Sequence, residues 1–455
     1  MKTTTLVLTL FIFINSFAAD SLSSRKELIY RCLDMEKEAG FDVKEKSYLL
    51  LDTLLLKAGK RININDTLAK NYPENILKEI HSIMEEAGIE GDYNQNNPYK
   101  SLLSYSLQSK KFDCDKYSFV FLAVAERLNL PLYGVLLPSH MAIEWKDSSR
   151  SFYWETTDQS KRTKEEYIKQ FAIQKYHQNQ GMYLTPMSEE DLRLCFLYNR
   201  GLTFLMLRKY QLAQRDIEAS ANLKGIHPFI HYMKELCIHR TTIDKSTLRL
   251  LQDPDNDSAR IERAKAYIQL RGVSNFQKAL SDLNYVILMD PAHKNAHLWR
   301  GVSYMQLFML GKLNNRHRNY KKALEDFNFV FAIDSNDYEV RFYKSILNRW
   351  ARNYEEAIAD IEIAISLQAT EEAWLEKGNI FYNQKEFEKA IECYHKALEI
   401  NPQYFKAIQC RGFAKLELEK KEDALEDFFQ AYYQGIMPYS YFKKYSELRA
   451  SYINQ

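Results

Sequence analysis

The sequence predicts two parts, an N-terminal α+β domain and a C-terminal all-α solenoid of stacked helix pairs. Residues from about 194 onward repeat with a period of about 34, whereas residues 21 to about 190 do not repeat and hold one strong helix pattern followed by three strand patterns. The 455 residues are 46% apolar and 27% charged, with 14 Gly and 10 Pro. This composition fits a folded chain of several domains and excludes disordered or collagen-like classes.

Charge and short motifs exclude several functional classes. Basic residues number 62 and acidic residues 60, so no net field attracts the chain to nucleic acid or to an anionic membrane. The sequence has no Gly-rich phosphate loop, no His-Glu-x-x-His and no Gly-x-Ser-x-Gly, and we therefore expect no nucleotide or metal cofactor. Among the six cysteines, only Cys393 and Cys410 are near enough in sequence to suggest a bridge, and a buried reduced pair is the favoured interpretation.

The first residues have the pattern of a secretory signal. Lys2 precedes an apolar run from Leu6 to Ile14, and the small-residue stretch Ser16-Phe17-Ala18 follows it. The run is too short to span a bilayer, and an uncleaved anchor is the alternative. We therefore predict a signal peptide at residues 1–18 and an exported, soluble protein that is periplasmic or extracellular.

The C-terminal repeat is defined by small and aromatic residues at fixed spacing. Gly412, Ala424, Phe428 and Ala431 are each displaced by 34 residues from their counterparts in the preceding unit. The clearest unit runs through Trp374, Gly378, Phe381, Ala390, Tyr394, Ala397 and Pro402. This pattern resembles the tetratricopeptide repeat (TPR) family, in which a small residue lets two antiparallel helices touch and an aromatic residue fills the gap beside it.

The register of the repeat divides residues 191–438 into units. We expect them at about 194–227, 228–259 as a degenerate pair, 260–293, 294–337 with an insertion, 338–370, 371–404 and 405–438, with a capping helix at 439–455. The insertion, Leu310 to Asn319, is expected to be a loop. Its basic residues, Lys312, Arg316, His317 and Arg318, are typical of a solvated loop more than of a dedicated anion site.

The TPR resemblance implies a scaffold that binds a protein or an extended peptide in a concave groove. Some family members hold a chaperone C-terminus with a Lys and an Asn, but Leu375 occupies the Lys position beside Asn379, so that ligand is not expected. The candidate groove residues are Tyr198, Leu298, Phe342, Asn379 and Tyr382.

The N-terminal domain, residues 19–190, begins with helical stretches at Leu28–Ala39 and Tyr48–Ala58. Its informative part starts at Phe112, where a polar segment leads into the apolar-periodic run Phe119–Leu128. This pattern predicts a helix with Cys114 at its N-terminus.

Three strands are predicted after that helix, at Leu132–Leu137, His140–Trp145 and Phe152–Thr156. Because a hairpin joins the second and third strands, His140 and Glu155 are expected on neighbouring strands that face the helix end. The spacing therefore allows a Cys-His-acid triad, with Asp158 as a rival for the acid.

The order of these residues resembles the transglutaminase-like superfamily, relatives of papain-type thiol enzymes. The cysteine motif Cys114-Asp115-Lys116-Tyr117 and the helix exit Glu126 to Pro131 carry the resemblance. The third member of the family triad is usually Asp, whereas this sequence has Glu155 after Trp154. The resemblance implies an α+β thiol domain that performs acyl transfer or hydrolysis on an amide or peptide, although members without activity keep the fold for binding.

The chemistry requires a thiolate, which a helix N-terminus and a nearby imidazolium both favour. His140 would supply the imidazolium, Glu155 would hold its tautomer, and Gln108 is a further candidate oxyanion donor. Asp113 and Asp115 disfavour a thiolate and are alternatively helix caps. We therefore carry two hypotheses: a cysteine hydrolase or acyltransferase whose repeats present the substrate, or a non-enzymatic interaction scaffold with an inactive thiol domain.

Overall fold

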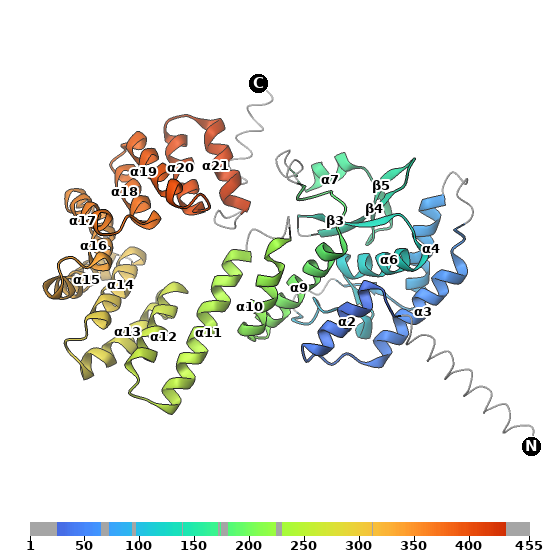
Figure 1. Ribbon diagram of the computed structural model, residues 1–455, viewed down its shortest axis with the longest axis horizontal. Coiled ribbons are helices and arrows are strands. Elements are labelled where there is room, and N and C mark those ends of the chain that lie inside the picture. Colours follow the sequence, from blue (N-terminus) through green and yellow to red (C-terminus); the bar gives the residue numbers. More distant parts are fainter. Residues whose placement is uncertain are drawn as a thin grey trace, which may run out of the picture. The chain divides into compact units, whose positions relative to one another are not determined.

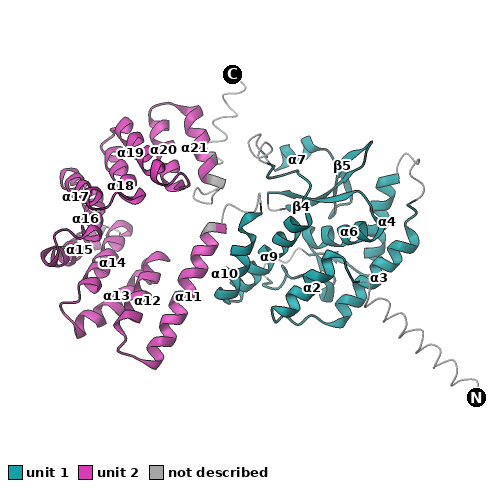
Figure 2. Ribbon diagram, viewed as in Figure 1, with its two compact units in different colours: residues 1–227 teal, residues 228–455 magenta. Residues whose placement is uncertain are grey.

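The structure is a computed structural model that describes residues 25–64, 72–92, 97–138, 140–171, 173, 181–223, 230–311 and 313–433. The chain forms two compact units, residues 1–227 and residues 228–455 (Figure 2). The predicted signal peptide, 1–18, and the predicted capping helix, 439–455, lie outside the described residues. Within the part of the chain that the structure covers, no helix combines the length and the apolar character needed to cross a membrane.

Helices dominate the first half of unit 1 (Figure 1). The first two, α2 (Leu28–Glu38) and α3 (Glu45–Arg61), confirm the helices predicted there. The elements that follow are α4 (Tyr72–Glu86), β1 (Glu90–Gly91), α5 (Leu103–Ser109), β2 (Lys111–Phe112) and α6 (Cys114–Leu128). Strands β1 and β2 pair in parallel, so the segment just before α6 is fixed by a short ladder.

The main sheet confirms the three predicted strands and adds a fourth. Its strands are β3 (Leu132–Leu137), β4 (His140–Lys146), β5 (Ser151–Glu155) and β6 (Ser160–Arg162), in the antiparallel order β3-β4-β5-β6. On β4 and β5, Ile143 is opposite Trp154. This register sets which side chains of the two strands share a face.

The two faces of this sheet are covered by different helices. Ile143 and Trp154 are buried in one cluster with Phe119 of α6. Ala142 and Tyr153, which point to the opposite face, are buried in a second cluster with Tyr167 of α7 (Lys164–Gln170). Because side chains alternate along a strand, His140 and Glu155 belong to the face that α7 covers.

The first repeat-like helix pair belongs to unit 1. It consists of α9 (Glu189–Met206) and α10 (Tyr210–Ala219), followed by a single 3₁₀ turn, η1 (Ser220–Asn222). Leu194 and Phe196 of α9 are buried in the same cluster as Leu33 of α2. Helix α9 therefore packs into the core of the N-terminal domain.

Unit 2 is built from antiparallel helices packed in sequence order (Figure 1). Its helices are α11 (Ile230–Gln252), α12 (Asp257–Gln269), α13 (Val273–Met289), α14 (Lys294–Leu310), α15 (Leu313–Ile333), α16 (Tyr338–Ala351), α17 (Tyr354–Leu367), α18 (Glu371–Asn383), α19 (Phe387–Ile400), α20 (Phe405–Glu417) and α21 (Lys421–Tyr433). The segment 228–259, expected to be an irregular pair, instead holds the single long helix α11.

Small residues allow the close approach that the repeat pattern predicts. A Cβ on Gly378 of α18 would lie 2.5 Å from Cε1 of Tyr394 on α19, and one on Gly412 would lie 2.7 Å from Cε1 of Phe428. Any larger side chain at either glycine would collide with the aromatic ring. In both repeats the glycine of the first helix therefore packs directly against the aromatic ring of the second helix.

A recurring ion pair, which the sequence analysis did not identify, joins the two helices of several pairs. In each case an Arg on the first helix meets a largely buried Asp on the second, with N–O distances of 2.6 to 2.8 Å. The pairs are Arg200–Asp216, Arg263–Asp282, Arg300–Asp326, Arg341–Asp360 and Arg411–Asp427.

The prediction of a loop at Leu310–Asn319 is wrong, because α15 begins at Leu313 and runs through most of the insertion. The segment contains no Pro, and a helix already formed downstream extends at little cost. Packing adds to this, since the Tyr320 ring lies 5.5 Å from that of Phe308 and the Arg316 guanidinium lies 4.8 Å from the Phe308 ring. Lys312 lies outside the described residues.

Candidate active site

Cys114 is the first residue of α6 and is half-buried. Asp113 caps the helix, because its side chain accepts a hydrogen bond from the backbone N–H of Lys116 at 3.4 Å. The predicted position of Cys114 at a helix N-terminus is confirmed. The thiol therefore lies at the positive end of the helix dipole.

The backbone of Cys114 is tied to the end of strand β5. Its carbonyl accepts hydrogen bonds from the hydroxyls of Ser118, at 2.7 Å, and Thr156, at 3.4 Å. Thr156 directly follows Glu155 in the chain. These bonds hold the start of α6 beside the strand that carries the acid.

The imidazole of His140 lies against Glu155. Nε2 of His140 is 2.7 Å from Oε2 of Glu155, and the two side chains are 17% and 8% exposed. The Glu155 carboxylate also accepts hydrogen bonds from Tyr167 Oη at 3.1 Å, Thr157 Oγ1 at 2.7 Å and Thr157 N–H at 3.3 Å. The acid is therefore held in one orientation by three residues.

Asp158, the rival acid, is bonded elsewhere. It accepts a hydrogen bond from the Ser160 N–H at 3.0 Å and forms an ion pair with Arg162 at 2.8 Å. Glu155, and not Asp158, is therefore the acid that bonds to the His140 imidazole.

The charge state of His140 is set by competing effects. Burial acts to lower the pKa of His140, but hydrogen bonds with Cys114 and Glu155 outweigh it and raise the pKa to about 10. Burial likewise acts to raise the pKa of Glu155, but the bond to His140 prevails and lowers it. Since Nε2 is occupied by Glu155, Nδ1 is the ring nitrogen left for another partner. The His140 side chain is therefore favoured as an imidazolium paired with the Glu155 carboxylate.

One face of the imidazole is covered by Phe171, which follows α7. The two rings are stacked with centroids 5.5 Å apart and planes 13° from parallel. Stacking of this kind fixes the plane of the imidazole and keeps water from that face. The sequence alone does not indicate this contact, because Phe171 is 31 positions from His140.

In the sequence Lys116 is only one residue of the cysteine motif, whereas in the structure its side chain lies between two aspartates. Its side chain is 4% exposed, and Nζ lies 3.1 Å from Asp113 and 3.0 Å from Asp115. Asn199, on α9, donates a further hydrogen bond to Asp115. Burial and the charge of Asp113 together raise the pKa of Asp115 to about 7.

Gln108, the additional oxyanion candidate, is tied to another part of the domain. Its side-chain amide donates a hydrogen bond to the backbone carbonyl of Asp42 at 2.9 Å. This bond orients the amide toward the loop after α2, so the structure gives no support for an oxyanion role.

The candidate groove residues divide into two kinds. Leu298 is wrong as a groove residue, because it is fully buried in the core and offers no surface to a ligand. The other four are half-buried, namely Tyr198, Phe342, Asn379 and Tyr382. Asn379 accepts a hydrogen bond from Tyr394 at 3.1 Å, and Tyr382 donates one to Glu417 at 3.3 Å.

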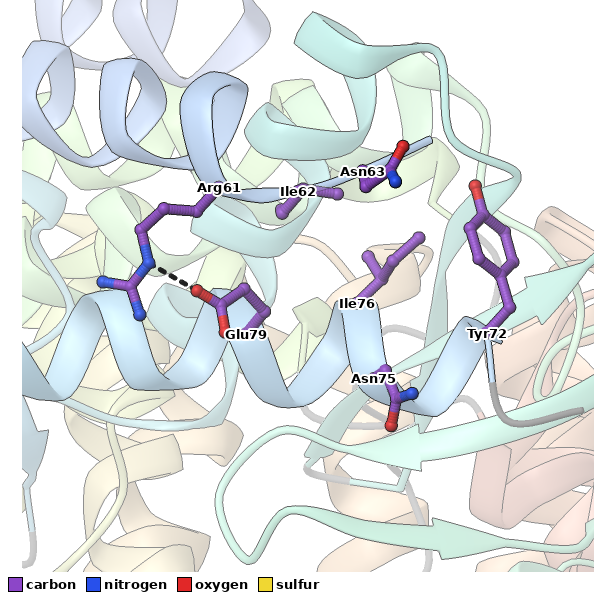
Figure 3. Close-up of a pocket in the computed structure, with 7 residues that line it drawn as sticks. All are labelled: Arg61, Ile62, Asn63, Tyr72, Asn75, Ile76 and Glu79. Carbon is purple, nitrogen blue, oxygen red and sulfur yellow. Dashed lines mark ion pairs between the residues drawn. The ribbon is translucent and has the colours of Figure 1, made fainter. Parts of the chain in front are cut away.

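Two cavities lie apart from these residues. One, of about 380 Å³, lies between α3 and α4, with the Arg61–Glu79 ion pair at one end and Tyr72 at the other (Figure 3). The second, of about 790 Å³, lies in unit 2 beside the extended start of α15 and is lined in part by Leu307, Arg318 and Lys322. Neither is lined by Cys114, His140 or Glu155.

Comparison with known families gives a match within each unit. Residues 45–194 match the transglutaminase-like superfamily, and residues 371–404 match the tetratricopeptide repeat. The chain therefore contains a transglutaminase-like domain and, later in the sequence, a TPR repeat. The predicted fold class, an α+β transglutaminase-like domain followed by an all-α TPR solenoid, is confirmed.

Several individual proteins to which this chain is similar are TPR proteins. It is 26% identical over 192 residues to TPR repeat-containing protein MJ1428 of Methanocaldococcus jannaschii, covering 40% of this chain and 33% of the relative. It is 24% identical over 183 residues to human tetratricopeptide repeat protein 13, covering 40% of this chain and 20% of the relative. The chain thus spans a third or less of the length of these relatives. A solved TPR protein from Parabacteroides merdae, 20% identical, aligns over 57% of this chain and 99% of its own with a TM-score of 0.40.

Proposed function

We propose that Cys114, His140 and Glu155 form a thiol catalytic centre that performs acyl transfer on an amide or peptide. The observation that supports this most directly is the bond between Nε2 of His140 and Glu155, together with the influence of Cys114, which helps to raise the pKa of His140. The helix-start position of Cys114 and the pairing of His140 with Glu155 support the roles of nucleophile, base and orienting acid.

In this mechanism the proton of the Cys114 thiol resides on His140, which is the imidazolium, and the Cys114 thiolate attacks the carbonyl carbon of the amide. The charge that develops on the carbonyl oxygen is stabilised by backbone N–H groups at the start of α6. His140 then donates its proton to the leaving amine, and a thioester on Cys114 remains. Attack by water gives hydrolysis, and attack by a second amine gives a crosslink.

The solenoid supplies the second half of the proposal, which is that it binds a protein or peptide and presents it to the thiol centre. The TPR match supports this, because stacked helix pairs form an extended surface suited to such ligands. A third element is export, which the apolar run at Leu6–Ile14 favours. Export is tested by fusing residues 1–18 to a reporter that is active only after translocation.

The catalytic proposal is tested by alkylation of the native protein with iodoacetamide. Cys114 and Cys410 are both half-buried, whereas the other four cysteines are buried, so Cys410 is an internal reference. Burial raises the pKa of Cys410 to about 11, as expected for a thiol that nothing activates. Peptide mass spectrometry then gives the labelling rate at each site.

We expect Cys114 to be labelled at least about tenfold faster than Cys410 at pH 7, and we expect His140→Ala to remove that difference while leaving Cys410 unchanged. Equal, slow labelling of Cys114 and Cys410 would refute the catalytic proposal. The protein would then be a non-enzymatic TPR scaffold that keeps the thiol fold for binding.

A further inference from the structure

The start of α6 presents an electrostatic problem for a thiolate. Asp113 and Asp115 are the immediate neighbours of Cys114, and both carboxyl groups are largely buried. A unit charge held at about 7 Å in a partly buried site shifts a neighbouring pKa by about one to two units. Two uncompensated aspartates would therefore oppose the ionisation that the proposed mechanism needs.

The Lys116 ammonium lies between these two carboxylates. Nζ donates to Asp113 at 3.1 Å and to both oxygens of Asp115, at 3.2 and 3.0 Å. A lysine that is 3% exposed is stable only when its charge is paired, so the ammonium is held in place by the same groups whose charge it offsets. When Asp115 is ionised, which its pKa of about 7 places near neutral pH, the two carboxylates and the ammonium together carry one net negative charge.

This cluster is anchored from a second helix. Asn199 of α9 donates to Asp115, which limits the movement of that carboxylate relative to Cys114. Cys195, also on α9, is fully buried beside the cluster, and its thiol stays neutral because burial raises its pKa. Asp113 and Asp115 are therefore the carboxylates bonded to the Lys116 ammonium, and the neighbouring Cys195 thiol adds no charge.

Other titratable groups near the cluster come from three elements. Glu36 of α2 is buried, and burial raises the pKa of its carboxyl group although the Lys116 ammonium acts in the opposite direction. His140 of β4 and Glu155 of β5 form the ion pair on the other side of Cys114. Glu36 accepts hydrogen bonds from the N–H groups of Leu103 and Ser104 at 2.7 and 2.9 Å, which fix its position at the start of α5.

We infer that Lys116 is a positioning residue for the thiol centre, whose ammonium offsets Asp113 and Asp115 and so allows Cys114 to ionise. The inference rests on the proposed function, because it concerns the same thiol. It predicts that the pH dependence of Cys114 alkylation follows the net charge of the cluster.

Three variants test this through the midpoint pH of Cys114 alkylation by iodoacetamide. Lys116→Met removes the positive charge at nearly constant length and should raise the midpoint by about one pH unit. Asp115→Asn removes one negative charge, keeps an oxygen for Asn199 and should lower the midpoint by a similar amount. The double variant Lys116→Met/Asp115→Asn restores the original net charge and should return the midpoint close to that of the wild type.

The return in the double variant is the decisive readout, since a purely structural role of Lys116 would leave the double variant at least as impaired as the single one. Lys111→Met, an exposed lysine three residues before Cys114, is the matched control and should not move the midpoint. Circular dichroism checks that each variant folds. If Lys116→Met does not fold, Asp115→Asn alone decides, and an unchanged midpoint overturns the inference.

The outcome is distinguishable from failure of the proposed function. If alkylation of Cys114 in the wild type does not depend on His140, the thiol centre itself is refuted. If that dependence holds but Lys116→Met and Asp115→Asn leave the midpoint where it was, the role of Lys116 is refuted and the triad remains.

Discussion

Nε2 of His140 lies 2.7 Å from Oε2 of Glu155, although the two residues are 15 positions apart and on different strands. The register of β4 and β5 brings them together. Ile143 lies opposite Trp154 on one face of the sheet, so the side chains of His140 and Glu155 share the other face. The carboxylate is in turn oriented by Tyr167 and Thr157. This pair favours the charged form of the imidazole.

Replacing Glu155 by Gln should slow alkylation of Cys114 at pH 7 by about tenfold or more. The amide keeps the shape of the side chain but removes the charge that stabilises the imidazolium, and the pKa of His140 falls. The measurement is the rate of Cys114 labelling with Cys410 as reference. The control is Glu165→Gln, an exposed carboxylate on α7, which should label at the wild-type rate. A Glu155→Gln protein as reactive as the wild type would remove Glu155 from the site.

The His140–Glu155 ion pair should stabilise the fold within a defined pH window. His140 has a folded pKa of about 10 against an ordinary 6.5, so its contribution is complete below pH 6.5 and is lost as pH rises through about 10. Glu155 has a pKa lowered from 4.5, so its contribution is present above pH 4.5 and is lost as pH falls through the lowered pKa. The window therefore runs from about pH 4.5 to about 10.

Calorimetry of the wild type and Glu155→Gln at several pH values checks this window. The difference in unfolding temperature between them should be largest between pH 5 and 6.5 and should shrink as pH approaches 10. A difference that stays constant from pH 5 to pH 10 would show that the two groups are not coupled.

Gly378→Ala should destabilise the contact between α18 and α19. The added Cβ would lie 2.5 Å from the ring of Tyr394, and relief of that overlap costs about 1–3 kcal/mol. Gly59→Ala in α3 is a control of opposite sign, because no atom of the described residues lies within 4 Å of its Cβ and alanine favours a helix by about 0.5–1 kcal/mol. Hydrogen exchange of the amides in α18 and α19 reports the loss, and unchanged exchange would contradict it.

Asp427→Ala should weaken the last described helix pair by about 3 kcal/mol. The Asp427 carboxylate is 3% exposed and accepts from Arg411 at 2.7 Å and Lys415 at 2.8 Å, so its removal leaves two cations without that partner. Glu426→Ala, one residue earlier and exposed, should change stability by less than about 0.5 kcal/mol. Faster hydrogen exchange across α20 and α21 in the first variant only is the expected result.

Local pattern was a reliable guide to the secondary structure of the thiol domain. The polar residues before Phe119 predicted that Cys114 begins a helix, and short β-rich runs bounded by turn residues predicted the strands that carry His140 and Glu155. The same kind of pattern was misleading at Leu310–Asn319, because polar composition is shared by loops and by exposed helical turns. Packing of Arg316 and Tyr320 on Phe308 favours the helix there.

The sequence by itself determined the repeat register and the order of thiol, imidazole and acid, because helix and strand periodicities are local properties of the chain. Only the tertiary structure decided that Glu155 rather than Asp158 meets the imidazole and that Lys116 lies between two aspartates. It also decided that Leu298 is buried. Such choices depend on strand register and on which helices pack together, and these are set by contacts between residues far apart in the chain.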